Sequence, residues 1–319
     1  MAEILKTAEA MERALALLGA GEVVAIPTET VYGLAGDATS GDAVARIFEA
    51  KGRPHFNPLI AHVSGIVMAT GIADFDQLSE KLAQAFWPGP LTLVLPLSRE
   101  ARIHPLVTAG LDTIALRMPQ GFGAELIARF GRPLAAPSAN SSGRITATSA
   151  EAVEADLGRR IPLIVDGGQT PVGLESTIVK VEDGRVRLLR PGGIAAEVIE
   201  AIAGRPVLRG AAAGIEAPGM LASHYAPGAA VRTGATSVHP GEALLAFGSR
   251  RVAGAERAVA VLNLSPTGDL REAAANLFSH MQALDRSGAA TIAVEPVPEA
   301  GLGEAINDRL RRAAAPRTA

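Results

Sequence analysis

The alternation of short apolar runs with amphipathic stretches constrains this fold more than any other feature of the sequence. Short runs rich in Val, Ile and Leu between turn residues predict buried strands, and stretches with an apolar residue every three or four positions predict helices. The two kinds follow one another without a repeat period. This pattern predicts an α/β or α+β chain rather than an all-helical one.

The first two-thirds of the chain contain most of the predicted elements. The predicted strands are 22–27, 58–63, 91–95, 113–116, 134–136, 163–165, 176–181 and 186–189. The predicted helices are 8–18, 40–50, 79–85, 123–130, 149–157 and 195–203. Asp183-Gly184, between the last two strands, has the residues of a two-residue hairpin turn, which pairs strands antiparallel. We therefore expect a twisted, open, mixed sheet of α+β type.

A second, smaller domain is predicted after residues 204–227, where the apolar periodicity fades into Gly, Ala and Pro. Beyond this stretch a strand–helix rhythm returns, which predicts a parallel, Rossmann-like α/β domain. Its strands are expected at 243–248, 258–264 and 291–294, and its helices at 269–286 and 303–312. The expected boundaries are 1–203 for the larger domain, 204–228 for a linker or lid, and 229–319 for the smaller domain.

Composition excludes several classes of function. The absence of cysteine excludes disulfides, thiolate nucleophiles and cysteine-ligated metal sites. A net charge of −3 argues against non-specific nucleic-acid binding as the main task, because that task needs a basic face. The start of the chain, "MAEILKTAEAMERALALLGAGE", predicts an amphipathic helix rather than a signal peptide, and no stretch has the length of a membrane span. A soluble, cytoplasmic protein is expected.

Polar residues gather where predicted strands end. "IPTETVYGLAGDA" places Thr28, Thr30 and Tyr32 directly after a strand. In "KGRPHFNPLIAHV", Lys51 and Arg53 lie between a helix and a strand, and two neighbouring cations suit phosphate oxygens. Taken alone, this pair is more typical of an exposed helix end whose charges complement the helix dipole.

The remaining polar segments strengthen the case for an anion site. "APSANSSGRITATSA" places Ser138, Asn140 and Thr148 between a strand and a helix N-terminus, which suits either an anion or a helix cap. Arg117 and Arg190 each lie at the end of a predicted strand. One such arginine is ordinarily a solvated edge residue. Together with the cations of the preceding motif, they predict a pocket for a ligand with several negative charges.

The common nucleotide and hydrolase motifs are missing from the sequence. It contains no GxxxxGK[ST], no GxGxxG after a strand, no GxSxG and no HExxH. Walker-type and Rossmann-type nucleotide sites, serine hydrolases and zinc proteases are therefore not indicated.

Six motifs in order resemble the YrdC/Sua5 family of threonylcarbamoyl-AMP synthases: "IPTETVYGLAGDA", "KGRPHFNPLIAHV", "FWPGPLTLVL", "TIALRMP", "APSANSSG" and "LESTIV…LLRPG". The resemblance covers about residues 8–200, and "APGMLASHYAP" at 217–227 matches the longer Sua5 type. The KxR and SxN pair of the family corresponds to Lys51-Gly52-Arg53 and Ser138-Ala139-Asn140. Where the longer type often carries basic residues before "HYAP", this chain has Leu221, Ala222 and Ser223.

The resemblance implies an enzyme that condenses L-threonine, bicarbonate and ATP to threonylcarbamoyl-AMP and pyrophosphate. A separate tRNA threonylcarbamoyl transferase complex would use the product at adenosine 37. Lys51 and Arg53 would supply catalytic charge. Threonine would contact Thr30, His62, Arg117, Ser138 and Ser176. ATP would contact Arg53, Asn57, Thr113, Asn140, Thr148, Arg190 and, once the linker closes as a lid, Tyr225, with His224 as a weaker candidate. Mg²⁺ would be held mainly by ATP phosphates and water, without a metal site of the protein's own.

Proximity and charge stabilisation are expected to lower most of the barrier, because the motifs offer no obvious carboxylate base. His62 is a candidate base, although a lone histidine near a strand end more often forms hydrogen bonds in a pocket wall. Two alternatives remain. Carbamoyl transfer, as in hydrogenase-maturation proteins, is weakened because the acylphosphatase and zinc-finger segments are missing. An RNA-binding module with a concave basic face is weakened by the few aromatic residues and the negative net charge.

Overall fold

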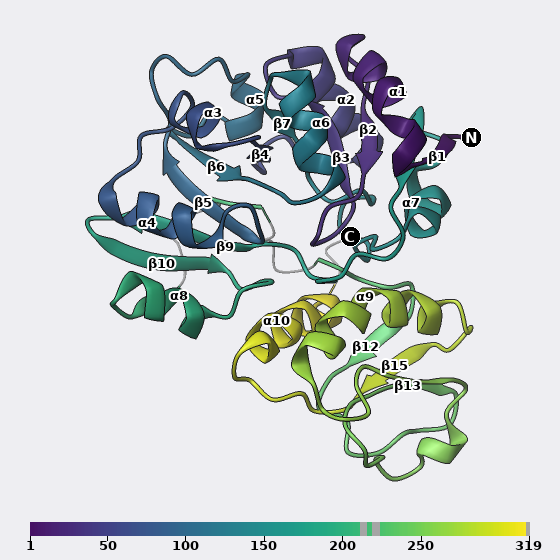
Figure 1. The fold of residues 1–319 in the computed structure, drawn as a ribbon. Helices are drawn as coiled ribbons and strands as arrows, with labels where there is room; N and C mark the ends of the chain where they lie inside the picture. The colour runs from purple at the N-terminus through teal and green to yellow at the C-terminus, as the bar shows by residue number, and fades with distance from the viewer. Residues whose placement is uncertain (211–215, 219–223, 317–319) are drawn as a thin grey trace.

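The computed structural model describes residues 1–210, 216–218 and 224–316, so Leu221, Ala222 and Ser223 of the expected linker lie outside the described residues. The chain forms a sheet of 11 strands and a sheet of 4 strands (Figure 1). The large sheet has the order β1-β8-β2-β3-β7-β4-β6-β5-β9-β10-β11 and mixes parallel with antiparallel pairs. The small sheet, β12-β15-β13-β14, is parallel. The expected fold class is confirmed.

The elements of the large sheet follow the apolar pattern closely. Its strands are β1 (Glu3–Lys6), β2 (Val24–Ile26), β3 (Gly33–Asp37), β4 (Ile60–His62), β5 (Leu91–Pro96), β6 (Thr113–Arg117), β7 (Leu134–Ala135), β8 (Leu163–Asp166), β9 (Thr177–Glu182), β10 (Arg185–Arg190) and β11 (Val207–Arg209). Its helices are α1 (Thr7–Gly19), α2 (Gly41–Lys51), α3 (Ile66–Thr70), α4 (Gln77–Phe86), α5 (Pro105–Thr108), α6 (Phe122–Phe130), α7 (Ala150–Leu157) and α8 (Ala196–Ala203). None of the described helices combines the length and apolar character that crossing a membrane requires.

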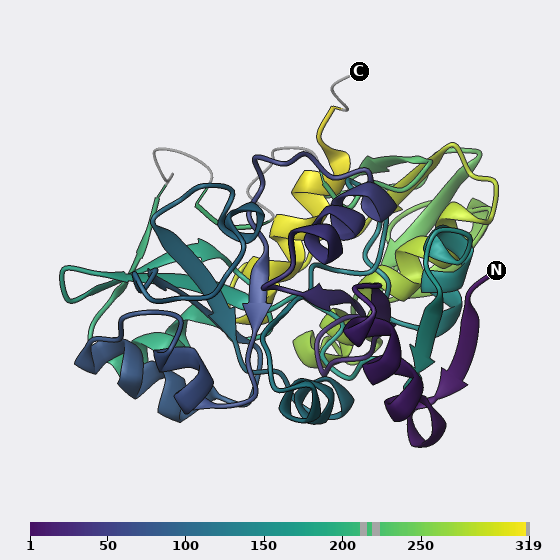
Figure 2. The same ribbon diagram turned by 90° about the horizontal axis from the view of Figure 1, so that it is seen from above.

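Strand alternation separates the main core from a polar face. Ala61 of β4 pairs with Leu116 of β6, and both side chains belong to the main core, which the helices α2, α4, α5 and α8 also line. The next pair in the same register is His62 with Arg117, whose side chains point to the opposite face because successive residues of a strand alternate. Figure 2 shows the purple N-terminal strand and the α4–α8 pair at opposite ends of this sheet.

The predicted hairpin is confirmed, whereas three strands of the large sheet, β1, β3 and β11, were not predicted. β9 and β10 pair antiparallel across Asp183 and Gly184, whose φ angles of 51° and 65° fit a hairpin turn with both central residues left-handed. β1 occupies the residues before the expected N-terminal helix and pairs with β8. β3 reads GLAGD, and a Cβ added at Gly36 would lie 3.1 Å from Ile47 Cδ1 of α2. Small residues there allow α2 to pack closely.

The smaller domain turns its helices toward the large one. It contains β12 (Ala230–Arg232), β13 (Glu242–Ala246), β14 (Val261–Asn263), β15 (Thr291–Val294), α9 (Leu270–Asp285), α10 (Leu302–Ala314) and a short 3₁₀ turn at Ala255–Arg257. In Figure 1, α9 and α10 lie between the small sheet and the large domain. The second hydrophobic core mixes the two domains, because Ile145, Leu174 and Tyr225 pack in one cluster with Leu277 and Phe278 of α9.

Candidate functional site

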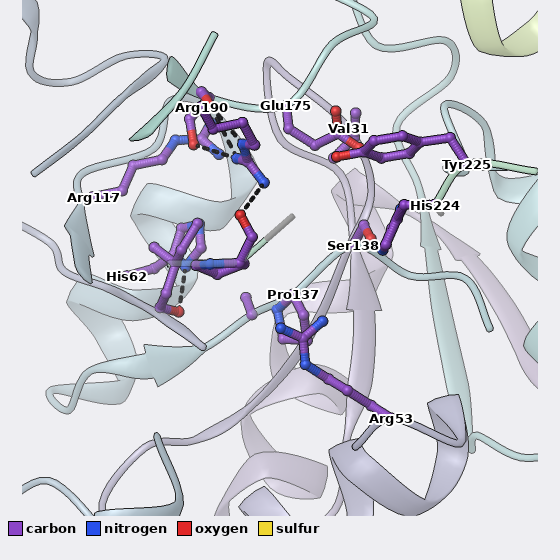
Figure 3. A pocket seen from close by; sticks show the side chains of 14 residues that line it. Val31, Arg53, His62, Arg117, Pro137, Ser138, Glu175, Arg190, His224 and Tyr225 are labelled. Atoms are coloured by element: carbon purple, nitrogen blue, oxygen red, sulfur yellow. Dashed lines mark hydrogen bonds between the residues drawn. The ribbon is translucent and has the colours of Figure 1, made fainter. Parts of the chain in front are cut away.

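A pocket lies on the polar face of the large sheet, where the end of the linker returns to it (Figure 3). The guanidinium groups of Arg53, Arg117 and Arg190 enter it from different sides, and we call it the arginine pocket. Its volume is about 50 Å³, far below the several hundred Å³ typical of ligand sites. Its walls are Val31, Arg53, Ile60, His62, Arg117, Ala136, Pro137, Ser138, Glu175, Ser176, Arg190, Pro218, His224 and Tyr225.

The ends of β4 and β6 bring His62 and Arg117 side by side. Arg117 forms an ion pair with Glu29, with 2.6 Å between Nη2 and Oε1, and donates from Nε to the carbonyl of Gly89. His62 is buried and its Nδ1 lies 3.2 Å from the carbonyl oxygen of Ile60. Burial, aided by the Arg117 charge, lowers the pKa of His62 to about 3. His62 is therefore neutral near pH 7, where it can form hydrogen bonds but is a weak base.

The ends of β9 and β10 supply Ser176 and Arg190. Arg190 donates from Nε and Nη2 to the carbonyl of Ser176, and from Nη2 to its hydroxyl at 3.2 Å. The Ser176 hydroxyl also lies 2.7 Å from the hydroxyl of Thr92 on β5. Burial lowers the pKa of Arg190, because water is excluded from the charged guanidinium. The hairpin thus places a serine hydroxyl and a buried cation next to each other.

Lys51 supports the Ser138–Asn140 loop from behind. Its ammonium donates to the carbonyls of Ser138 and Asn140, and the side chain is 2% exposed. Burial, followed by repulsion from Arg53, lowers the pKa of Lys51 well below its usual value. The reading of Lys51 and Arg53 as an exposed helix end is wrong, because both side chains are buried. Lys51 is not among the residues that line the arginine pocket.

Arg53 and Asn57 lie on the loop that follows α2. Arg53 donates from Nη2 to the carbonyl of Pro58 at 2.8 Å and from Nε to that of Asn57. Burial and the charge of Arg190 lower the pKa of Arg53 to about 10, so it remains a cation at pH 7. The amide of Asn57 is 1% exposed, and neither of its polar atoms has a hydrogen-bond partner in the described part of the chain. Buried polar groups of this kind are rare without a ligand or water.

Pro218, His224 and Tyr225 of the linker line the pocket. Ala217 packs on the polar face against Ile60, Val94 and Ala115, and Pro218 accepts a hydrogen bond from Arg190. Tyr225 is 1% exposed and has a φ of 63°, which non-glycine residues rarely adopt.

The neighbour of this tyrosine is equally enclosed. The rings of His224 and Tyr225 are 4.2 Å apart. Burial lowers the pKa of His224 to about 3, which makes it neutral. The backbone N–H of Ala226 donates to the carbonyl of Gly143, which ties the linker to the loop after Asn140. The strained tyrosine and the neutral histidine are both held against the pocket.

Eight of the residues nominated from sequence line the arginine pocket, namely Arg53, His62, Arg117, Ser138, Ser176, Arg190, Tyr225 and the weaker candidate His224. Six others lie beside it or further away: Thr30, Lys51, Asn57, Thr113, Asn140 and Thr148. Thr30 is buried one residue before Val31, and Thr28 caps that turn by accepting from the N–H groups of Thr30 and Val31.

Thr113 and Thr148 have surroundings that differ from those of the arginine pocket. Thr113 begins β6, at the opposite end from Arg117, and lines a separate cavity of about 490 Å³ with Asp112 and Lys180. Thr148 accepts from the amide of Gln169 and precedes Ser149, which alone caps α7. The structure does not bring either threonine into the arginine pocket.

Sequence reasoning missed three charged residues around the pocket. Glu29 and Glu175 lie directly before Thr30 and Ser176 inside recognised motifs, so their positions were visible in the sequence. Arg309 of α10 forms an ion pair with Glu175, with 3.0 Å between Nε and Oε2. Nothing in the sequence connects α10 with a motif more than 130 positions earlier.

Comparisons with known proteins place this geometry in a family. Residues 16–192 match the Sua5/YciO/YrdC family, described as "Telomere recombination", and residues 194–315 match the family described as "Threonylcarbamoyl-AMP synthase, C-terminal domain". The chain belongs to the Sua5/YciO/YrdC family. It is 43% identical to a threonylcarbamoyl-AMP synthase of Bacillus subtilis over 321 residues, which cover 95% of this chain and 92% of that one.

Solved structures of family members agree. The structure of Pyrococcus abyssi Sua5 complexed with L-threonine matches with a TM-score of 0.87 and 37% identity, covering 98% of this chain and 97% of that one. Escherichia coli YciO matches with a TM-score of 0.53 and 19% identity, covering 60% of this chain and 96% of that one, which shows a shared fold. The Sua5/YciO/YrdC fold therefore occurs both with and without a C-terminal domain.

Proposed function

We propose that this protein is a threonylcarbamoyl-AMP synthase, which condenses L-threonine, bicarbonate and ATP to threonylcarbamoyl-AMP and pyrophosphate. The observation that carries the proposal is the arginine pocket, where three buried guanidinium groups surround serine hydroxyls in the fold of a Sua5 protein that binds L-threonine. Only a ligand with several negative charges complements such a pocket well. ATP together with an amino-acid carboxylate supplies those charges.

Threonine fits the Arg117 side of the pocket. The guanidinium of Arg117 can bind a carboxylate as a planar fork, with Glu29 holding it in place. The hydroxyls of Ser138 and Ser176 are suitable partners for the ammonium and hydroxyl groups of threonine. The neutral His62 adds a hydrogen-bonding wall without a competing charge. Thr30, whose hydroxyl lies 2.9 Å from that of Thr28, is proposed to contact threonine on this side.

ATP fits the side of Arg53 and Arg190. Arg53 is a cation at pH 7, Arg190 adds a second buried guanidinium, and the amide of Asn57, which has no partner among the described residues, can bind a polar ligand atom. Asn140, Thr113 and Thr148 are proposed to contact the nucleotide further along the sheet. The pocket is too small for ATP in this arrangement, so the linker must move for ATP to enter and Tyr225 contacts it after closure.

The proposed reaction also uses a magnesium ion. Mg²⁺ is proposed to arrive with ATP and to keep phosphate and water ligands, as this ion prefers. The described residues contain no group of three or more His, Asp or Glu arranged to hold a metal.

The reaction needs little side-chain chemistry. The threonine amine loses a proton and attacks bicarbonate, water leaves, and a carbamate forms. A carbamate oxygen then attacks the α-phosphate, and pyrophosphate leaves with its electron pair. The arginines hold the two anions together and stabilise the charge on the phosphates.

The product is proposed to pass to a tRNA threonylcarbamoyl transferase complex in the cytoplasm, so the synthase itself does not need to bind tRNA. An RNA-binding role receives no support from the pocket, because its arginines are at most 7% exposed and cannot form a basic surface.

The test is mass spectrometry of the nucleotides formed from ATP, bicarbonate and a panel of amino acids. We expect threonylcarbamoyl-AMP only when threonine and bicarbonate are both present, with an equal amount of pyrophosphate. Arg190→Lys is the matched variant, because it keeps the charge and loses the fork. Pyrophosphate release that does not depend on threonine, or ATP consumption without the adenylate, would refute the proposal.

A further inference from the structure

One arginine of the C-terminal domain is buried against the site domain. Arg309 of α10 has a side-chain exposure of 0% and is among the largest fully buried side chains of the described chain. Its Nε donates to Glu175, and its Nη1 donates to the carbonyl of Pro191 at 2.8 Å and to Asp308. Its guanidinium carbon lies 5.1 Å from the centre of the Tyr225 ring, within range of a cation–π contact.

The partners of Arg309 are the segments that carry the proposed ligands. Glu175 directly precedes Ser176, Pro191 directly follows Arg190, and Tyr225 belongs to the linker. Glu175 and Pro191 flank the β9–β10 hairpin, whereas Tyr225 follows more than 30 positions later in the linker. A single guanidinium therefore joins three walls of the arginine pocket without lining it.

Both carboxylate oxygens of Glu175 accept hydrogen bonds. Its Oε1 accepts from the Thr146 hydroxyl at 2.6 Å and its Oε2 accepts from Arg309. Gln282 of α9 donates to the carbonyl of Thr146, so α9 contacts the residue whose hydroxyl holds this carboxylate. Burial opposes ionisation of Glu175, but Arg309, Arg190 and the Thr146 bond together lower its pKa, so it stays an anion.

Two domains can pack against each other without a buried ion pair. Burying an ion pair has a desolvation cost that well-packed apolar side chains of similar volume avoid, and such pairs are weak evidence for stability. The hydrophobic part of this interface already packs Ile145 and Leu174 against Leu277 and Phe278 without any charge. A charged fork at the one point where three pocket walls meet is better explained by their positioning.

We propose that Arg309 is a positioning residue through which the C-terminal domain holds Glu175 and the end of β10 in place and supplies the cation against which Tyr225 packs when the linker closes. This inference rests on the proposed synthase function. Two of the three segments that Arg309 contacts carry proposed ATP ligands. Its loss should therefore affect ATP more than threonine.

The test uses the full-length protein with four variants. Arg309→Met removes the fork and keeps much of the volume, and Arg309→Lys keeps the charge without the fork. Arg311→Met is the matched control, because Arg311 lies on the same helix, is exposed and pairs only with Glu299 among the contacts described. The double variant Arg309→Met/Glu175→Gln avoids a buried unpaired carboxylate, in case the single variant does not fold.

For Arg309→Met we expect kcat/KM for ATP to fall about 10- to 100-fold, as a displacement of about 1 Å in a site can cause. Threonine binding, measured by calorimetry without ATP, should change little, and Arg309→Lys should be intermediate. If Arg309→Met does not fold, the double variant decides by the same measurements.

Activity of the deciding variant equal to that of Arg311→Met would overturn the proposal. So would an equal loss of ATP and threonine affinity, because a general loosening of the fold predicts that result. Inactivity of the wild-type protein would instead refute the synthase function. In that case amide exchange still tests the positioning: the N–H groups of His224 and Ala226 should exchange faster in Arg309→Met than in Arg311→Met, and equal rates would overturn it.

Discussion

Replacing Lys51 by methionine should loosen the Ser138–Asn140 loop rather than only remove charge from the phosphates. The buried ammonium donates to two carbonyls of that loop. A hydrogen bond from a charged group contributes about 1.5–3 kcal/mol, so the pair contributes about 3–6 kcal/mol. Methionine avoids the cost of burying an ammonium, several kcal/mol, which offsets part of this loss. We expect a net destabilisation of about 1–3 kcal/mol, which lowers Tm by about 1.5–4.5 °C in a protein of 319 residues.

Calorimetric titration with threonine in the absence of ATP distinguishes the two roles of Lys51. If Lys51 positions the loop, threonine binding weakens in Lys51→Met because Ser138 lies on that loop. If Lys51 only faces the phosphates, threonine binding is unchanged and ATP binding alone suffers. Lys81→Met, at an exposed position of α4, is the matched control. An unchanged Tm together with wild-type threonine affinity in Lys51→Met would refute the positioning role.

Four further predictions concern other parts of the molecule. Arg53→Ala should raise KM for ATP about 10- to 100-fold while calorimetry still detects threonine binding, because charge-assisted bonds to phosphate are lost; wild-type turnover would contradict the ATP assignment. Serine should be a poorer substrate than threonine by about 10- to 200-fold in kcat/KM, the worth of one methyl group; equal values would mean that no methyl niche exists. The pKa of His62 is about 3 in the folded protein and about 6.5 in an unfolded chain, so on acidification the unfolded chain binds the proton first. The free energy of unfolding should therefore fall by up to about 1.4 kcal/mol per pH unit between those two values. In denaturant titrations at several pH values, the free energy of unfolding of His62→Asn should depend less steeply on pH, and the same dependence as in the wild type would refute the lowered pKa. Gly173→Ala should destabilise the protein by at least about 1–2 kcal/mol, because Gly173 has a φ of 72° and an added Cβ would lie 2.4 Å from Ala275 Cα; an unchanged Tm would show that α9 can shift.

The elements that depend on local residue patterns could be predicted from the sequence. Alternation along β4 and β6 placed His62 and Arg117 at strand ends, and the observed register sets them side by side on the polar face. The hairpin at Asp183 was equally readable, because few residue pairs accept two positive φ angles.

What the sequence could not show depends on contacts between distant segments. The side chain of Lys51 points behind a loop instead of into the pocket, which no local pattern reveals. β3 has the glycine content of a turn and becomes a strand because α2 packs closely on it. Arg309 lies in an ordinary amphipathic helix, and only the docking of that helix makes it part of the site.

The second hydrophobic core is shared by the two domains, which matters for family members that lack the C-terminal domain. Ile145 and Leu174 lie in the larger domain, yet they are buried among side chains of α9 and α10. Deleting the chain after α8 would expose both apolar side chains to water. It would also remove Arg309, the ion-pair partner of Glu175. A member without the C-terminal domain is therefore expected to carry polar side chains on this face. Short and long members should differ there in polarity, and a chimera that joins a short member to this C-terminal domain would first have to restore that apolar surface.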